Sequence, residues 1–156
     1  MRDLAILKAA CDAIIADSTL QPKKDAQGKI LETFCNVGAQ RVANAMGCRE
    51  LDRQMADGMY SVMALNASKK WNQVLGSAAS LWAQSGGLAF AAMTSLQLKE
   101  AHGHIAAIYP APMEFSGSMG HPVPLVANVG KTDDEEKESM AFPVLFGEPE
   151  YFTWNG

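Results

Sequence analysis

Cysteine is scarce in this chain of 156 residues, and its three copies follow no familiar spacing. An odd number leaves at least one cysteine unpaired, and no two stand in the Cys-x-x-Cys spacing of a metal or redox site. The sequence therefore predicts neither a disulfide framework nor a cysteine-based zinc site. It is compatible with a reactive thiol.

Long apolar runs and clusters of basic residues are missing as well. The longest apolar runs, residues 88–93 and 105–108, are far shorter than the roughly 20 residues that span a bilayer. The formal net charge is −4, and Lys and Arg do not gather into the patch that binds nucleic acid. We therefore expect neither a membrane nor a nucleic acid as partner, and a small, neutral or peptide-like ligand instead.

The first residues of the sequence predict no secretory signal. Met1-Arg2-Asp3 leads directly into an amphipathic pattern, without the basic start, apolar core and cleavage site of a signal peptide. We expect a protein that is made in the cytoplasm and reaches any outside destination by another route.

The composition, with 48% hydrophobic and 19% charged residues, is typical of one globular domain, here residues 1–156. Its first half carries apolar residues at helical spacing, which predicts helices at residues 4–15, 33–47, 52–65 and 68–84. Thr33 is expected to cap the second helix, so that Cys35 falls in its first turn. Gly76 marks a point where the last helix could break.

The second half predicts strands, because short apolar runs are bounded there by turn residues. We expect strands at residues 88–93, 104–109, 123–129 and 142–146. Residues 114–122 and the acidic run at 133–136 are expected to form loops. Helices first and neighbouring strands afterwards, with short connections, predict an α+β domain whose N-terminal helices pack on a small antiparallel sheet.

A cysteine at a helix start and a histidine at a strand start are the minimum parts of a thiol nucleophile and its base. Cys35 would lie at the positive end of the helix dipole, which favours thiolate over thiol. His104 opens its strand and could share the proton, while backbone N–H groups near Cys35 could hold an oxyanion. Cys11 and Cys48 are expected to be core residues.

A zinc site is the alternative use of the histidines. His102 and His104 form a His-x-His pair whose side chains would lie on one side of a strand, and His121 could join them. However, no acidic or cysteine ligand is close in sequence, and His102 is expected in the turn before the strand. The sequence therefore predicts no metal and no cofactor.

Four motifs follow one another along the chain: Phe34-Cys35-Asn36, the helix through Gly47, the Gly-rich turn into residues 88–93, and Gly103-His104-Ile105-Ala106. In this order they resemble the papain-like cysteine amidases and peptidases of bacterial cell-wall metabolism, the NlpC and CHAP superfamily. The arrangement is similar to that of small phage lysis enzymes and of amidase effectors injected by type VI secretion systems. The resemblance covers residues 33–130. Many relatives have Asp before the nucleophile and Ser-Gly after it, where this chain has Phe34 and Asn36.

This resemblance implies a papain-like NlpC-type fold and an acyl-enzyme mechanism, with Cys35 as nucleophile and His104 as general base and then acid. In the family, the residue that orients the histidine usually comes from the next strand, which makes Asn128 the first choice and His121 the second. A neutral Asn can fix the imidazole tautomer, as an Asp would. The implied substrates are peptidoglycan stem peptides, and residues 114–121 are the expected wall of their cleft.

The resemblance also implies a place of action in the periplasm or cell wall, after injection or lysis-type release, with an immunity or delivery protein as a further partner. Two other functions stay open at this point. The same thiol chemistry could serve an acyltransferase or a peptidase directed at other proteins. Alternatively, the fold could serve as a binding domain without catalysis.

Overall fold

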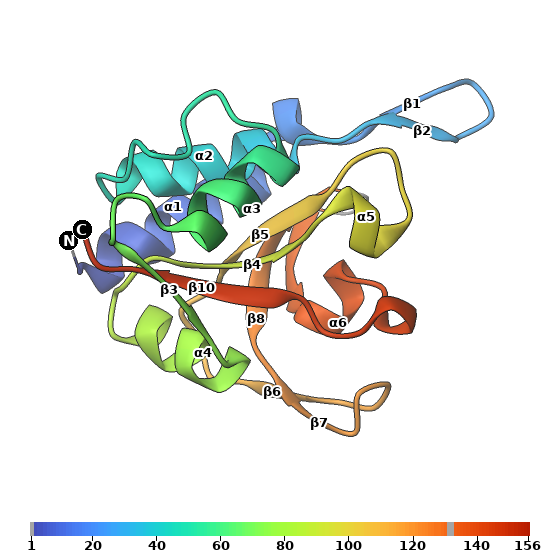
Figure 1. Ribbon diagram of the computed structural model, residues 1–156. Helices are drawn as coiled ribbons and strands as arrows, with labels where there is room; N and C mark the ends of the chain where they lie inside the picture. The colour runs from blue at the N-terminus through green and yellow to red at the C-terminus, as the bar shows by residue number, and fades with distance from the viewer. Residues whose placement is uncertain (1, 131–132) are drawn as a thin grey trace.

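The core of the structure is a six-stranded antiparallel sheet (Figure 1). The computed structural model describes residues 2–130 and 133–156. From edge to edge, the strand order is β3 (Trp71–Val74), β10 (Glu150–Trp154), β4 (Ala89–Met93), β5 (His104–Ile108), β8 (Leu125–Val129) and β9 (Asp133–Lys137). Every neighbouring pair is antiparallel.

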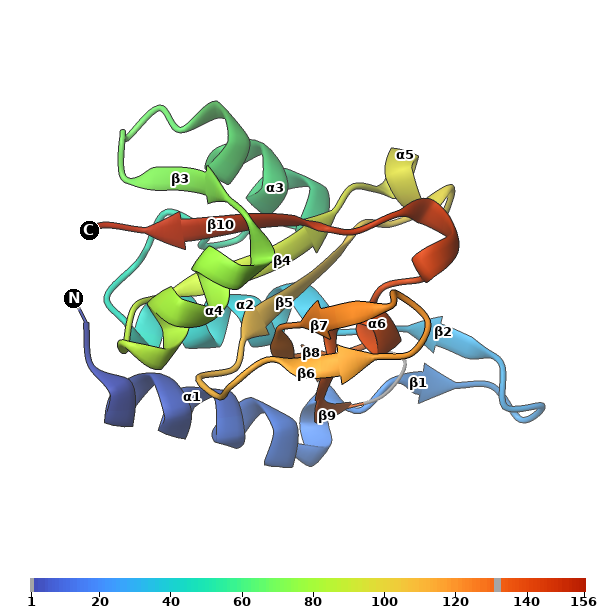
Figure 2. The same ribbon diagram turned by 90° about the horizontal axis from the view of Figure 1, so that it is seen from below.

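Among the described residues, four longer helices surround this sheet (Figures 1 and 2): α1 (Leu4–Ala16), α2 (Cys35–Ala45), α3 (Ala56–Leu65) and α4 (Gly76–Gln84). Adjacent residues of β10 show that both faces are covered. Phe152 contacts Tyr60 of α3 edge-on, with 5.6 Å between ring centroids, whereas Tyr151 lies against Gly76 of α4. As a result, β4 and β8 are buried along their whole length, which explains their continuous apolar sequences.

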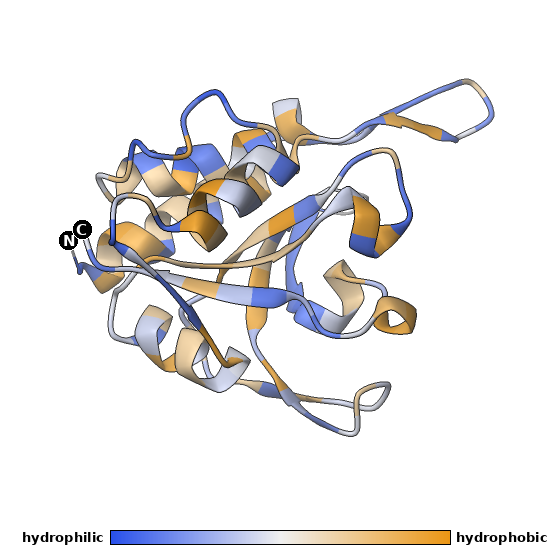
Figure 3. Cartoon of the chain, viewed as in Figure 1, coloured by the Kyte–Doolittle hydropathy of each residue, from blue (hydrophilic) through white to orange (hydrophobic). Residues whose placement is uncertain are grey.

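Shorter elements complete the fold. The described residues include two hairpins: β1 (Lys23–Lys24) with β2 (Ile30–Glu32) in the connection from α1 to α2, and β6 (Glu114–Ser116) with β7 (His121–Val123) in the connection from β5 to β8. The short helices are α5 (Ser95–Leu98), α6 (Glu138–Ala141), η1 (Ser18–Leu20) and η2 (Val144–Phe146). Figure 3 shows largely hydrophobic residues along β4, β5 and β8. None of the described helices has the length and apolar character that crossing a membrane requires.

The predicted α+β class, with helices packed on an antiparallel sheet, is confirmed. The first three predicted helices and the first three predicted strands exist, with ends shifted by a few residues. Cys35 is the first residue of α2, as predicted for the first turn. The N-cap is Phe34 and not Thr33, and its side chain makes no capping hydrogen bond. Gly47 ends the helix with a φ of 82°, a conformation that suits glycine.

Several local predictions are wrong. The helix predicted at 68–84 divides into β3 and α4, residues 114–122 form a hairpin, and residues 142–146 contain the turn η2 in place of a strand. The acidic run forms the edge strand β9, because pairing of its backbone with β8 outweighs the low strand propensity of acidic residues. Charges on such an edge also protect it from pairing with other chains. Strand β10 was outside every predicted element.

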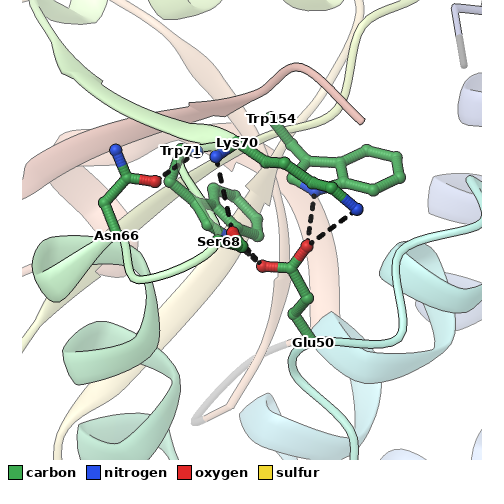
Figure 4. A network of polar contacts seen from close by, with 6 residues as sticks. All are labelled: Glu50, Asn66, Ser68, Lys70, Trp71 and Trp154. Atoms are coloured by element: carbon green, nitrogen blue, oxygen red, sulfur yellow. Dashed lines mark hydrogen bonds and ion pairs between the residues drawn. The ribbon is translucent and has the colours of Figure 1, made fainter.

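The carboxylate of Glu50 joins several polar groups at the end of the sheet where β3 and β10 meet (Figure 4). Three side chains donate hydrogen bonds to it, and a fourth forms an ion pair: Trp71 Nε1 at 3.0 Å, Ser68 Oγ at 2.7 Å, Trp154 Nε1 at 3.4 Å and Lys70 Nζ at 3.6 Å. Trp71 and Trp154 are only 1% and 6% exposed. Loss of the carboxylate would therefore leave buried indole donors without their acceptor.

Replacing Glu50 with alanine should lower the free energy of unfolding by about 1–3 kcal/mol, the usual cost of an unsatisfied buried donor. Urea denaturation followed by tryptophan fluorescence measures this change. Glu32→Ala is the control, because it removes a carboxylate from an exposed hairpin pair with Lys23 and should leave the denaturation midpoint unchanged. Equal midpoints for Glu50→Ala and wild type would show that the network does not stabilise the fold.

Candidate active site

A cavity of about 920 Å³ lies where the start of α2, the start of β5 and α6 meet. Cys35, His104 and Asn128 all line it, although they come from distant parts of the sequence. Its other walls come from residues 30–34 of the β1–β2 hairpin, 55–57, 98, 100–103 and 139–143. The structure thus brings the three residues predicted for the site to one cavity.

Cys35 lines the cavity and is nearly buried, with 6% of its surface exposed. Burial raises the pKa of its thiol above the ordinary value. The backbone N–H groups of Ile105, Asn36 and Cys35 itself act in the opposite direction and lower this pKa. The sequence predicted that the helix start favours the thiolate, but burial is the larger effect, so the pKa of the thiol is raised overall. A thiolate at neutral pH needs a proton acceptor close by.

Glycine allows α2 to approach the sheet closely. A Cβ at Gly38 would lie 3.1 Å from Cγ2 of Val129 on β8, which is tighter than ordinary contact. A larger side chain at this position would push the first turn of α2 outward. The sulfur of Cys35 would then move away from the N–H of Ile105 and from the start of β5.

The imidazole of His104 is confined by its neighbours. Its Nε2 lies 2.8 Å from Oδ1 of Asn128 on the adjacent strand β8. The ring of Phe142 packs against it, with 4.9 Å between centroids, and a Cβ at Gly130 would lie 2.9 Å from its Cε1. With Nε2 committed to Asn128, chemistry with the thiol of Cys35 falls to Nδ1.

Packing also explains why glycine precedes His104. A Cβ at Gly103 would collide with Oδ1 of Asp57 and with the carbonyl oxygen of Met93. Asp57 itself is held in place, because it accepts hydrogen bonds from the backbone N–H of Ser95 at 2.7 Å and from its hydroxyl at 2.6 Å. Glycine thus precedes His104 because α3 and the start of β5 lie too close together for a larger side chain.

Of the two candidates for the residue that orients His104, the structure places Asn128 beside it and His121 elsewhere. His121 begins β7, where its Nε2 lies 2.8 Å from Oε1 of Glu148. The prediction that residues 114–121 wall the cleft is wrong, since none of them lines the cavity. Their hairpin lies toward α4 and β10, where His121 and Tyr151 line a separate pocket of about 180 Å³.

One polar partner of this site lies outside the predicted set. Asn128 Nδ2 donates a hydrogen bond to Oε1 of Glu136 at 2.7 Å. Glu136 belongs to the acidic run that was expected to be a solvated loop. In β9 it lies two residues beyond Asp134, which pairs with Asn128, so the two side chains share a face of the sheet. Without that register, the sequence offers no sign that Glu136 reaches the site.

The chemical character of the cavity is mildly acidic. Among the described residues, the charged side chains that line it are Glu32, Asp57 and Glu100, and no Lys or Arg does so. These walls favour a neutral or cationic segment over an anionic one. His102 lines the cavity from the bend before β5, and the described residues contain no group of three His, Cys, Asp or Glu side chains able to hold a metal ion.

Comparison with protein families and with curated protein sequences identifies no relative of this chain. No protein-family model matches the chain, and no curated protein sequence matches it. The likeness to NlpC and CHAP enzymes thus stays a prediction from the order of the motifs.

The three cysteines should differ strongly in reactivity toward iodoacetamide. Cys11 and Cys48 are fully buried, and burial raises their thiol pKa values to about 12 and about 11, so both should stay unmodified in the folded protein. Cys35 faces the cavity and should react first. Peptide mapping by mass spectrometry measures each rate, and equal rates for all three would contradict the assignment.

Removal of the imidazole should shift the reaction of Cys35 to higher pH. Burial raises the thiol pKa, and each unit of increase lowers the thiolate fraction at neutral pH about tenfold. In His104→Ala this effect would act without a proton acceptor, so the rate at pH 7 should fall about tenfold or more and recover only in alkaline solution. The same pH profile in wild type and variant would show that His104 does not accept the proton.

A buried acid lies next to the residues of α6 that line the cavity. Glu138, the first residue of α6, is 1% exposed, and its Oε2 has no hydrogen-bond partner among the described residues. Burial, helped by the charge of Glu148, raises its pKa to about 7, while His121 and a hydrogen bond with Tyr151 act in the opposite direction. Glu138 is therefore largely protonated below neutral pH.

Glu138→Gln should stabilise the fold in a pH-dependent way. Below about pH 4, the acid is protonated in both the folded and the unfolded state and costs nothing. As the pH rises to about 7, the unfolded state ionises first, so the wild type loses stability and then stays at the lower level. The variant should gain on the order of 2 kcal/mol at pH 8 and little at pH 4.5. Thermal unfolding at both values measures this, and a gain independent of pH would contradict it.

Proposed function

We propose that this protein is a cysteine amidase or endopeptidase that cleaves an amide bond in peptidoglycan peptides through an acyl-enzyme on Cys35. The observation that carries the proposal is the meeting of Cys35, at the start of a helix, with the His104–Asn128 pair on one cavity. A nucleophile, a base and a residue that orients the base are the three parts that covalent acyl transfer requires.

The first half of the reaction forms the acyl-enzyme. Nδ1 of His104 takes the proton from the thiol of Cys35, and the sulfur attacks the carbonyl carbon of the substrate. The backbone N–H groups of the first turn of α2, at Cys35 and Asn36, are suited to hold the resulting oxyanion. When the C–N bond breaks, the imidazolium returns the proton to the leaving amine, and the acyl group stays on the sulfur.

The second half releases the acid. A water molecule takes the place of the amine, and Nδ1 of His104 removes one of its protons as the oxygen attacks the thioester carbon. The C–S bond then breaks, the sulfur recovers a proton from the imidazolium, and the product leaves as a carboxylic acid. General base catalysis of this kind contributes about 10²–10⁴ to the rate.

Burial of the thiol fits this use of His104. Because a dry environment opposes an isolated thiolate, the charged form gains most when the imidazolium forms beside it at the same moment. Exclusion of water also strengthens the pull of the backbone N–H groups on developing charge. The cavity is thus suited to a reaction in which charge appears only as the proton moves.

The substrate class rests on the resemblance to cell-wall enzymes, and the cavity supports it by size and charge. Its volume of about 920 Å³ is enough for a segment of peptide, and its acidic walls favour a neutral or cationic segment. Action on peptidoglycan would place the protein in the periplasm or cell wall after injection or release, with an immunity or delivery protein as its partner. An acyltransferase, a protein-directed peptidase and a binding domain are the competing functions.

Purified peptidoglycan incubated with the wild-type protein should release new stem-peptide or cross-bridge ends that mass spectrometry identifies. Cys35→Ala should lower the rate of release at least about 10³-fold, since the nucleophile is lost. Cys48→Ala is the matched control, because it removes a thiol that is buried away from the cavity and should leave the products unchanged. Full activity of Cys35→Ala, or no products from the wild type, would contradict the proposal.

A further inference from the structure

The hydrogen-bond chain that starts at His104 continues past Asn128 to the carboxylate of Glu136. Nε2 of His104 lies 2.8 Å from Oδ1 of Asn128, and Nδ2 of Asn128 donates to Oε1 of Glu136 at 2.7 Å. The two bonds cross three adjacent strands, β5, β8 and β9. Asn128 is 3% exposed, whereas Glu136 is half-buried at the edge of the sheet. An acid at the edge is thus connected to the ring inside the cavity.

The chemistry of a carboxylate sets the direction of this chain. An ionised carboxylate only accepts hydrogen bonds, so the group that faces Glu136 must be the NH₂ of the Asn128 amide. The carbonyl oxygen of the same amide then faces His104. Because that oxygen also only accepts, Nε2 of His104 must carry a hydrogen. In the neutral imidazole, Nδ1 is then unprotonated, which is the form that can take a proton from a thiol.

Without the carboxylate, this pair of residues could adopt the opposite arrangement. The oxygen and nitrogen of an Asn amide are nearly equal in size, and half a turn about the last side-chain bond exchanges them. The turned amide of Asn128 would offer its NH₂ to His104. The ring would then keep its proton on Nδ1 and could not act as a base toward Cys35.

We infer that Glu136 is a positioning residue: its carboxylate holds the Asn128 amide in one orientation and thereby keeps the basic nitrogen of His104 at Nδ1. During the reaction, the thiol proton moves from Sγ of Cys35 to Nδ1, while the proton on Nε2 stays in its bond with Asn128. No covalent bond forms at Glu136, and no proton leaves or reaches it. The effect on rate rests on the proposed thiol mechanism, whereas the tautomer is a property of the folded protein alone.

Nuclear magnetic resonance of protein labelled with ¹⁵N-histidine tests the tautomer directly, at a pH where the imidazole is neutral. Correlations between ring nitrogens and ring protons distinguish the two tautomers, and His104→Ala identifies the signal among the three histidines. We expect the Nε2–H tautomer in the wild type. Glu136→Leu removes the acceptor and should shift His104 toward the Nδ1–H tautomer. A pure Nε2–H tautomer in Glu136→Leu would overturn the inference.

A polarity swap tests the same chain by rescue. Asn128→Asp alone sets two carboxylates against each other and should lower kcat about 100-fold. Adding Glu136→Gln lets the new glutamine amide donate to the new aspartate, whose other oxygen can still accept from Nε2 of His104. The double variant should recover to within about tenfold of wild-type kcat. If it is no more active than Asn128→Asp, the inference fails.

The neighbouring acid provides the control. Glu135 is exposed, and as the adjacent residue of β9 its side chain points to the other face of the sheet. Glu135→Gln should keep the wild-type tautomer and rate, whereas Glu136→Leu should lower kcat about 10- to 100-fold with little change in KM. Leucine and glutamine are compatible with an edge strand, and thermal unfolding verifies that each variant is folded.

The results separate this inference from the proposed function. If the wild-type protein releases nothing from peptidoglycan, the function fails, and the tautomers of wild type and Glu136→Leu still decide the role of Glu136. If the wild type cleaves peptidoglycan and Glu136→Leu keeps both tautomer and rate, the function stands and the inference about Glu136 is wrong.

Discussion

The first turn of α2 lies against the start of β5, and the whole geometry of the cavity depends on this contact. Gly38 lets the helix approach Val129, and α2 contacts β5 directly. A shift of the helix by one turn, about 5.4 Å, would carry the thiol out of reach of the strand. The glycines around the site, at positions 38, 103 and 130, therefore act through the space that they leave rather than through their flexibility.

The imidazole of His104 is held by a neutral amide, and a carboxylate holds that amide in turn. Burial opposes an isolated thiolate on Cys35, and the ring of His104 contacts the amide of Asn128 and the ring of Phe142. A neutral amide comes first, and the acid Glu136 follows at the edge of the sheet. Orientation of the imidazole is thus transmitted across three strands, from Glu136 on β9 through Asn128 on β8 to His104 on β5.

Local patterns in the sequence were sufficient for some parts of this site. Cys35 at a helix start and His104 at a strand start could be predicted, because helical spacing, turn residues and a following glycine mark such boundaries. Asn128 required the further assumption that the next strand lies beside β5. Strand β9 could not be found in this way, since it is charged along its length. Strand β10 contains strand-forming aromatic residues and Thr153, but its place between β3 and β4, which precede it by many residues, has no local signal.

Which features could be predicted from the sequence, and which only the folded structure shows, depends on the range of the interactions involved. Hydrophobic periodicity and glycine act over a few residues, so the chain alone determined that Cys35 opens a helix and His104 opens a strand. The choice of Asn128 over His121, and the link from Asn128 to Glu136, arose from strand order and register in the folded sheet. Those depend on backbone pairing between segments far apart in the chain, which leaves no local pattern to read.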